Sequence, residues 1–336
     1  MHFSLLFFLF CSLFVCPVVS TQSFKMVGRQ YHRTADEIRE YHAERKQQLG
    51  ELYVPGYPDI IVSTYLMIGT PPQVFEVGFE TGSDDLWVLS EGYPGRKENQ
   101  SFYDPGKSVS SVKRKQFTEV SEGLGLYGQG YSDVVVLENR TIQFFGVVEG
   151  SSNPEYAGLE FPLDFEGVLG MAWNPNKLDV GEYSPPIVNI LDQLGEGVPR
   201  IYTIWLKMGM IPDIGRWMVY ATAFGHQDEF DCATDYNFVP LSFDTTNEVM
   251  FFPLDSFQMG AFKTKTGGSA RVDTGLPIIA VPQDLFFQDG NCAVTFDLAS
   301  AYTTTDYGIG NPFLWNYCQQ FDLDNGRLGF ATALDV

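Results

Sequence analysis

The sequence has few of the residues on which many classes of enzyme depend. Only four of its 336 residues are His and five are Cys. After residue 50 the one remaining His is His226, which stands in a polar turn, and no Gly-x-Ser-x-Gly motif occurs. A Ser-His-Asp hydrolase is therefore excluded. No Cys/His cluster has the spacing of a zinc site, and we expect neither a metal nor an organic cofactor.

Basic residues are also scarce, with 21 Lys and Arg against 42 Asp and Glu. Residues 21–50 hold six of the basic and four of the acidic residues, so the rest of the chain carries a net charge of −23. Such an acidic body repels nucleic acid and anionic membranes, and we expect neither as a partner. Two interpretations stay open: the body attracts the basic segment 21–50 near neutral pH, or the charge serves solubility alone.

Long apolar runs are absent except at the start of the chain. Residues 1–20 are nearly free of charge, end in small residues and are short for a membrane span. We interpret them as a secretory signal peptide, with a membrane anchor as the less favoured alternative. The protein is therefore expected to be secreted and extracellular, with the lysosome as another possible destination. Glycosylation sequons at Asn99 and Asn139 agree with secretion but also arise by chance.

Cysteine usage also fits secretion. Cys11 and Cys16 leave with the signal peptide, and Cys232, Cys292 and Cys318 remain. Because this number is odd, one thiol is expected to be unpaired or to form an intermolecular bond.

The rest of the chain has the composition of a β-rich globular protein. Aromatic residues make up 15%, and there are 33 Gly and 19 Pro. Short β-branched and aromatic runs alternate with turn residues after residue 50, which predicts an all-β body. Helices are predicted only at residues 33–49 and 185–195. Near the end of the chain, residues 324–326 (Asp-Asn-Gly) predict a hairpin turn rather than a calcium site.

An internal repeat carries the strongest chemical signal. Glu80-Thr81-Gly82 recurs as Asp273-Thr274-Gly275, and residues 167–170 have a looser counterpart in 307–310. Two fixed carboxyl groups that share one proton can activate water to attack an amide. The Gly of each motif permits the sharp turn at which two backbones approach each other. The repeat predicts a duplicated lobe with the two acids meeting at the interface.

These motifs resemble the pepsin and cathepsin D family of aspartic peptidases, peptidase family A1. The resemblance rests on residues 65–73, 79–88, 167–173, 272–275, 308–318 and 324–331, and it covers the chain from about residue 50 to the end. It implies a bilobal all-β fold with lobes at 51–224 and 225–336, and an inhibitory propeptide at 21–50. It also implies a monomeric zymogen that binds a peptide or protein substrate in the interlobe cleft, with Glu80 and Asp273 as the catalytic pair and Thr81, Gly82, Thr274 and Gly275 in support.

Several departures weaken the expectation of catalysis. The family's first catalytic Asp is replaced by Glu80, whose extra methylene displaces the carboxyl group. Ser83 matches the hydroxyl residue that supports the first carboxylate, whereas Leu276 cannot donate a hydrogen bond to the second. In the flap, Glu122 takes the place of the family's Tyr before Gly123. Trp87, the usual neighbour of that Tyr, is retained.

The second lobe also looks abbreviated. Glu80 and Gly170 are 90 residues apart, whereas Asp273 and Gly310 are only 37 apart. Either roughly fifty residues of strand and loop are lost, or the sequence reflects a mispredicted gene model. In the family this region contributes a Cys partner, so the resemblance implies a Cys232–Cys318 disulfide with Cys292 left alone.

Two functional hypotheses follow. The first is an aspartic endopeptidase that acts at acidic pH, with turnover reduced or lost because of Glu80. The alternative is a non-catalytic secreted pseudoprotease that binds peptides or proteins.

Overall fold

The computed structural model describes most of the chain after residue 60 and one short segment before it. The described residues are 24–30, 60–119, 125–137, 140–142, 144–152, 165–175, 184–205, 216–229, 231–244, 249–259, 262–276, 279–281, 296–298, 306–314 and 316–334. Within these ranges no helix has the length and apolar character that a membrane crossing needs.

Strands dominate the fold, which confirms the predicted all-β class, and most of them join one sheet of 15 strands. Its order is β13 (Asn237–Pro240), β21 (Arg327–Thr332), β20 (Tyr317–Asp322), β11 (Ile201–Trp205), β12 (Arg216–Phe224), β1 (Phe24–Gln30), β2 (Ile60–Ile68), β3 (Gln73–Glu80), β10 (Gly167–Gly170), β4 (Leu86–Leu89), β9 (Phe145–Ser151), β6 (Leu126–Ser132) and β5 (Val112–Glu119). Two further strands, β7 (Val135–Leu137) and β8 (Arg140–Ile142), lie off this path, with β7 paired to β2.

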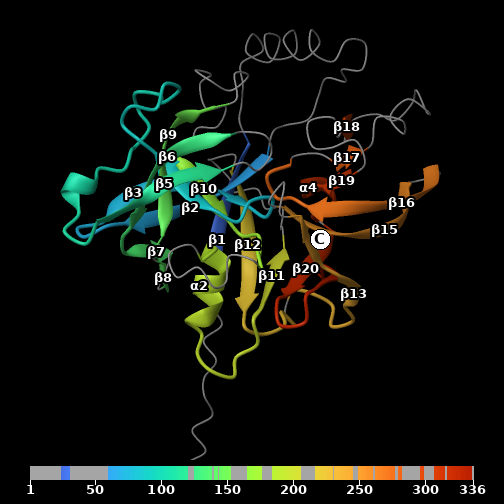
Figure 1. The fold of residues 1–336 in the computed structure, drawn as a ribbon. Helices are drawn as coiled ribbons and strands as arrows, with labels where there is room; N and C mark the ends of the chain where they lie inside the picture. The colour runs from blue at the N-terminus through green and yellow to red at the C-terminus, as the bar shows by residue number, and fades with distance from the viewer. Residues whose placement is uncertain are drawn as a thin grey trace, which may run out of the picture.

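A second sheet has six strands from the later part of the chain. Its order is β14 (Ser242–Asp244), β15 (Val249–Met259), β16 (Phe262–Val272), β19 (Asp306–Ile309), β17 (Ile279–Val281) and β18 (Phe296–Leu298). Figure 1 shows β2, β3, β5, β6 and β9 on one side of the molecule and β15 to β19 on the other, with β1, β11, β12 and β20 between them.

The sequence repeat is also a structural repeat. In the first copy, β10 pairs in parallel with β3 and antiparallel with β4. In the second copy, β19 pairs in parallel with β16 and antiparallel with β17. Each arrangement brings a short strand that contains glycine beside the strand that leads into an acid-Thr-Gly turn, so both turns have the same local scaffold.

The basic N-terminal segment contributes a strand to the middle of the large sheet. Strand β1, within residues 21–50, pairs antiparallel with β12 on one side and with β2 on the other. Two ladders of backbone hydrogen bonds therefore hold this part of the segment in the sheet. The helix predicted at 33–49 lies outside the described residues.

Side-chain alternation explains how the strands bury one face. Along β2, Leu66 and Ile68 are fully buried, whereas Tyr65 and Met67 are exposed. This period of two is the pattern of a strand that covers a core on one side. The main hydrophobic cluster contains residues from both sheets, such as Phe79 before the first acid and Val272 before the second.

Helices are few and short among the described residues. A 3-10 turn spans Pro105–Lys107, α2 spans Pro186–Asp192, and α4 spans Asn311–Leu314. The predicted helix at 185–195 is thus present as α2, which begins after Pro185 and buries Ile187, Val188, Ile190 and Leu191. The chain leaves it through Gly195, whose φ of 105° suits glycine.

A disulfide joins Cys232 to Cys318, as the resemblance implied, with an S–S distance of 2.01 Å. Both Cys are fully buried beside Trp205. The bond closes a loop of 86 residues and links the segment just before β13 to β20. Cys292 lies outside the described residues.

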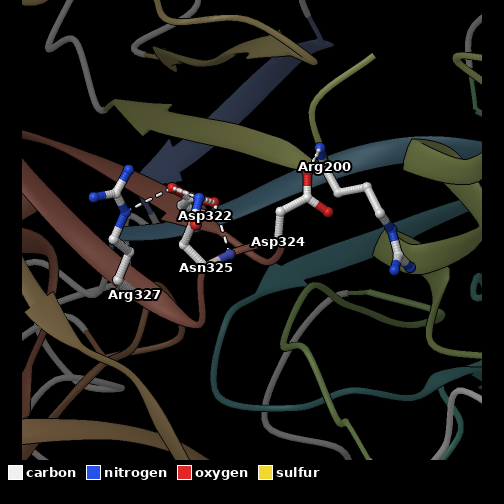
Figure 2. Close-up of polar contacts among 5 residues, drawn as sticks. All are labelled: Arg200, Asp322, Asp324, Asn325 and Arg327. Atoms are coloured by element: carbon white, nitrogen blue, oxygen red, sulfur yellow. Dashed lines mark hydrogen bonds and ion pairs between the residues drawn. The ribbon is translucent and has the colours of Figure 1, made fainter. Parts of the chain in front are cut away.

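The C-terminal hairpin forms as the Asp-Asn-Gly turn predicts. Strands β20 and β21 pair from Tyr317 to Thr332, and Figure 2 shows the polar side chains at the turn. Asp322 accepts hydrogen bonds from the side chains of Asn325 and Arg327, at 2.9 and 2.7 Å. Asp324 accepts one from the amide of Arg200 at 2.9 Å. These carboxylates are thus engaged in holding the turn and the chain before β11.

Candidate active site

The two acid-Thr-Gly turns meet, although 193 residues separate them, and their threonines bind each other's backbone. Thr81 accepts a hydrogen bond from the amide of Thr274 at 3.1 Å, and Thr274 accepts one from the amide of Thr81 at 3.1 Å. Each hydroxyl also donates, Thr81 to the carbonyl of Val272 and Thr274 to that of Phe79, both at 2.8 Å. Both threonines are buried. The four bonds fix the distance between the strand ends that carry the acids.

The glycines of the two motifs let each turn approach the opposite carboxyl group. A methyl group added at Gly82 would lie 3.0 Å from Cγ of Asp273, and one added at Gly275 would lie 3.0 Å from Oε1 of Glu80. The same point above Gly275 is 3.1 Å from Oδ1 of Asp273. Carboxyl oxygens of both acids therefore gather around one glycine, and any side chain there would displace them.

Glu80 is held through its backbone by the neighbouring strand. It is the last residue of β3, it pairs in register with Gly170, and its carbonyl accepts a hydrogen bond from the amide of Met171 at 2.7 Å. A methyl group at Gly170 would lie 2.5 Å from the carbonyl oxygen of Asp85 in the loop after β3. The glycine thus lets β10 pass close beneath the loop that carries the first acid.

Asp273 is fully buried and both of its carboxylate oxygens are engaged. Oδ1 accepts a hydrogen bond from the amide of Gly275 at 2.9 Å, and Oδ2 forms an ion pair with Nη2 of Arg271 at 3.0 Å. The amide of Asp273 donates to the carbonyl of Ile309 at 3.0 Å, which anchors the turn to β19. The second acid is therefore fixed more completely than a lone side chain on a turn.

The electrostatics of the pair favour a proton on Glu80. Burial of the Glu80 side chain is the largest effect on its pKa and raises it. The Asp273 carboxylate raises this pKa further, and the Arg271 guanidinium lowers it in part. Together they raise the pKa of Glu80 from its ordinary value of 4.5 to about 8. A carboxyl group that stays protonated to neutral pH can donate a hydrogen bond or a proton there.

Comparison with known proteins identifies this arrangement. The model of the eukaryotic aspartyl protease family matches residues 63–288, more than half of the chain and both turns. The chain belongs to the eukaryotic aspartyl protease family. The match to the family model therefore supports the pepsin-like resemblance and the all-β fold independently of the motifs.

Named relatives span nematodes, mammals and amoebae. Aspartic protease 1 of Caenorhabditis elegans is 27% identical, with 87% of this chain and 88% of that protein aligned. Cathepsin D of Dictyostelium discoideum is 26% identical over 97% of this chain and 99% of its own length. Pepsin A of Suncus murinus is 26% identical over 75% and 63%. The similarity to the first two thus extends over nearly the whole aspartyl protease chain.

Three other expected site residues lie on the same scaffold. The Ser83 hydroxyl accepts a hydrogen bond from the amide of Asp85 at 3.3 Å. Leu276 follows the second turn, is buried, and packs against Ala280. Trp87 lies on β4, is buried, and belongs to a separate apolar cluster with Phe117, Leu126 and other residues. Ser83 and Leu276 therefore follow the two acids closely in the chain, and Trp87 lies two strands away from Glu80, with β10 between them.

Three of the predicted residues lie in parts of the chain that the structure does not describe. The flap residues Glu122 and Gly123 and the sequon residue Asn139 lie outside the described residues. Asn99 lies in an exposed turn, where its side chain is accessible. Its glycosylation stays a prediction.

Arg271 is the site residue that the sequence reasoning missed. It stands two residues before Asp273, and side chains at i and i+2 of a strand point to the same face. That spacing was the available signal.

Proposed function

We propose that this protein is an aspartic endopeptidase of slow turnover, which hydrolyses peptide bonds with Glu80 and Asp273. The observation that carries the proposal is the gathering of both carboxyl groups around Gly275, between two turns fixed by reciprocal threonine hydrogen bonds. Two carboxyl groups that cannot both ionise easily, placed side by side, are suited to activating a water molecule.

In the proposed reaction the pair holds one proton and a water molecule lies between the acids. The ionised carboxylate takes a proton from the water as its oxygen attacks the peptide carbonyl carbon, and the protonated carboxyl donates to the carbonyl oxygen. Collapse of the tetrahedral intermediate breaks the C–N bond, and the amine nitrogen leaves with a proton. The substrate is a peptide or an unfolded protein segment.

Slow turnover follows from the same residues. The extra methylene of Glu80 moves its carboxyl by about one carbon–carbon bond, and a misplacement of about 1 Å can cost on the order of 100-fold in rate. Leu276 brings only an apolar side chain to the second turn, where a hydroxyl would support the carboxylate. Both effects lower the rate without changing the fold.

Cleavage of denatured globin at acid pH tests the proposal, with pepstatin as inhibitor. We expect weak, pepstatin-sensitive cleavage that Asp273→Ala abolishes and that Glu80→Asp raises by on the order of 100-fold. Cleavage that survives Asp273→Ala would refute the assignment of the pair. If Glu80→Asp leaves the rate unchanged, Glu80 is not the main cause of slow turnover and the abbreviated second lobe becomes the better explanation.

A second candidate is a peptide-binding protein without turnover. The observation that favours it is the ion pair with Arg271, which engages an oxygen of Asp273 that a catalytic water would otherwise use. Pepstatin or peptide binding measured by calorimetry, without cleavage even in Glu80→Asp, would support this candidate against the first.

The proposal includes a secretory route and a zymogen. Removal of residues 1–20 as a signal peptide and of 21–50 as a propeptide is expected before the protein acts outside the cell or in a lysosome. Relatives named pepsin A, probable vacuolar protease A and cathepsin D are compatible with either destination. The intact mass of the secreted protein tests both cleavages, glycosylation and the state of Cys292, and its sedimentation tests the expected monomer.

A further inference from the structure

A buried tyrosine contacts the segment that supports the first acid. Tyr202 lies on β11 and is 1% exposed, and its hydroxyl donates a hydrogen bond to the carbonyl oxygen of Met171 at 2.7 Å. The amide of Met171 donates in turn to the carbonyl oxygen of Glu80 at 2.7 Å. Two hydrogen bonds through one residue thus connect β11 to the backbone of the first acid.

Residues 170–172, the support segment, hold the turn and loop that begin at Glu80. Three hydrogen bonds of 2.7 to 2.8 Å run from amides of the support segment to carbonyl oxygens of that loop, from Gly170 to Asp85, from Met171 to Glu80 and from Ala172 to Ser83. Met171 and Ala172 are fully buried. A movement of the support segment would therefore move the first acid with it.

The ring of Tyr202 is itself fixed inside the large sheet. It stacks on the two residues opposite it in the neighbouring strands, Phe321 of β20 at 4.6 Å and Phe224 of β12 at 6.4 Å between ring centroids. Figure 1 shows these strands together in the middle of the molecule. Burial raises the pKa of Tyr202 well above its ordinary value of 10, so the hydroxyl keeps its proton and remains a donor.

We propose that Tyr202 is a positioning residue whose hydroxyl fixes the support segment and thereby keeps the carboxyl group of Glu80 in place beside the second acid. The side chain of Glu80 has one more rotatable bond than that of Asp, so a fixed backbone matters more for its placement. A misplacement of about 1 Å can cost on the order of 100-fold in rate. The inference rests on the proposed function and adds to it a residue that lies outside both turns.

The titration of Glu80 tests this without requiring any cleavage. Tyr202→Phe removes only the hydroxyl and keeps the stacked ring. Burial is the largest cause of the raised pKa of Glu80, and Asp273 and Arg271 supply the charges that act on it. A loosened support segment lets the ionised carboxyl reach water, so its midpoint should fall from about 8 by about 1 pH unit or more.

The midpoint is read from unfolding free energies measured across the pH range. The unchanged protein is compared with Glu80→Gln, and Tyr202→Phe with the double variant Tyr202→Phe/Glu80→Gln, so that all other titrating groups cancel. Tyr103→Phe is the matched control, because Tyr103 is also buried and its hydroxyl donates to Asp133 at 2.6 Å. It should lose stability and keep the Glu80 midpoint.

A merely structural role would lower the stability of Tyr202→Phe and leave the Glu80 midpoint at its original value, and that result overturns the proposal. An equal shift of the midpoint in Tyr103→Phe overturns it as well, since the shift would then report general loosening. Should Tyr202→Phe fail to fold, amide exchange of Met171 in the unchanged protein decides. Exchange only through global unfolding supports a fixed support segment, and faster local exchange overturns it.

Cleavage of globin adds a second readout. Tyr202→Phe should lower kcat by about 10-fold and change KM by less than about twofold, because placement of the acid affects the chemical step more than binding. An unchanged kcat in a protein that does cleave overturns the positioning role. A lowered midpoint without any globin cleavage in the unchanged protein would refute the proposed function and leave this inference standing.

Discussion

Replacement of Glu80 by Gln should remove a large pH dependence from the stability of the protein. Gln has nearly the shape of a protonated Glu and never ionises. The carboxyl of Glu80 has its pKa raised from 4.5 to about 8 by burial and by Asp273, with partial relief from Arg271. In the unfolded chain it returns to its ordinary value, so the folded state binds the proton more tightly.

The sign and the size of the effect follow from proton linkage. Because the folded-state pKa is raised, the stabilising contribution is fully present below pH 4.5 and is lost as the pH rises through about 8. At about 1.4 kcal/mol per pH unit, the loss amounts to roughly 5 kcal/mol, as an upper value for a group that retains some exposure. Glu80→Gln should match the unchanged protein near pH 4.5 and exceed it in stability by several kcal/mol near pH 9.

Urea unfolding followed by tryptophan fluorescence at intervals from pH 4.5 to pH 9 measures this difference. All other titrating groups are shared by the two proteins and cancel when one free energy of unfolding is subtracted from the other. Glu91→Gln, at an exposed position in a turn, is the matched control and should give a flat difference. Parallel stability curves for Glu80→Gln and the unchanged protein would show that Glu80 is ionised in the folded state and would refute the electrostatic description of the site.

Three further changes test the scaffold of the pair. Thr81→Val removes two buried hydrogen bonds to the facing turn and should cost about 2–4 kcal/mol of unfolding free energy. Thr118→Val, at an exposed position on β5, is the control and should change the unfolding free energy by less than about 0.5 kcal/mol. Urea unfolding compares the two variants, and equal losses would contradict a stabilising role for the threonine hydrogen bonds. The double variant Cys232→Ala/Cys318→Ala should lose about 2–5 kcal/mol of unfolding free energy, measured as a lower melting temperature. An unchanged melting temperature would show that the disulfide does not stabilise the fold. Gly170→Ala places a methyl group 2.5 Å from a backbone carbonyl oxygen and should cost about 1–3 kcal/mol by urea unfolding; a neutral result would mean that β10 can move away from the first turn.

Much of the fold could be predicted because its signals are local and periodic. Short β-branched runs between turn residues gave the all-β class, and Pro185 with Gly195 delimited α2. The repeat of acid-Thr-Gly predicted that the two acids meet, since a duplicated turn has the same scaffold in both copies. The carboxyl-bearing turns were thus accessible from sequence through their glycines, which are required wherever backbones approach closely.

Other features depend on pairing across long distances and could not be derived in the same way. Strand β1 contains Gly28 and three residues with long polar side chains, Lys25, Arg29 and Gln30, and a basic segment of that kind suggests an exposed tail rather than the centre of a sheet. Strand β1 fills the position between β2 and β12, and that position exists only once these two distant strands are placed in the sheet. The reciprocal roles of Thr81 and Thr274 likewise need both turns to be placed before a hydrogen bond can be assigned.

The raised pKa of Glu80 and the position of Arg271 both bear on the total charge of the site. A buried pair of carboxyl groups with one proton carries one negative charge, which is costly to keep away from water. Arg271, 3.0 Å from Asp273, offsets that charge, and Glu80 keeps its proton up to about pH 8. The site therefore does not need acid to reach its singly protonated state. If the proposed reaction takes place, its rate should persist toward neutral pH in the unchanged protein, because Glu80 keeps the shared proton up to about pH 8.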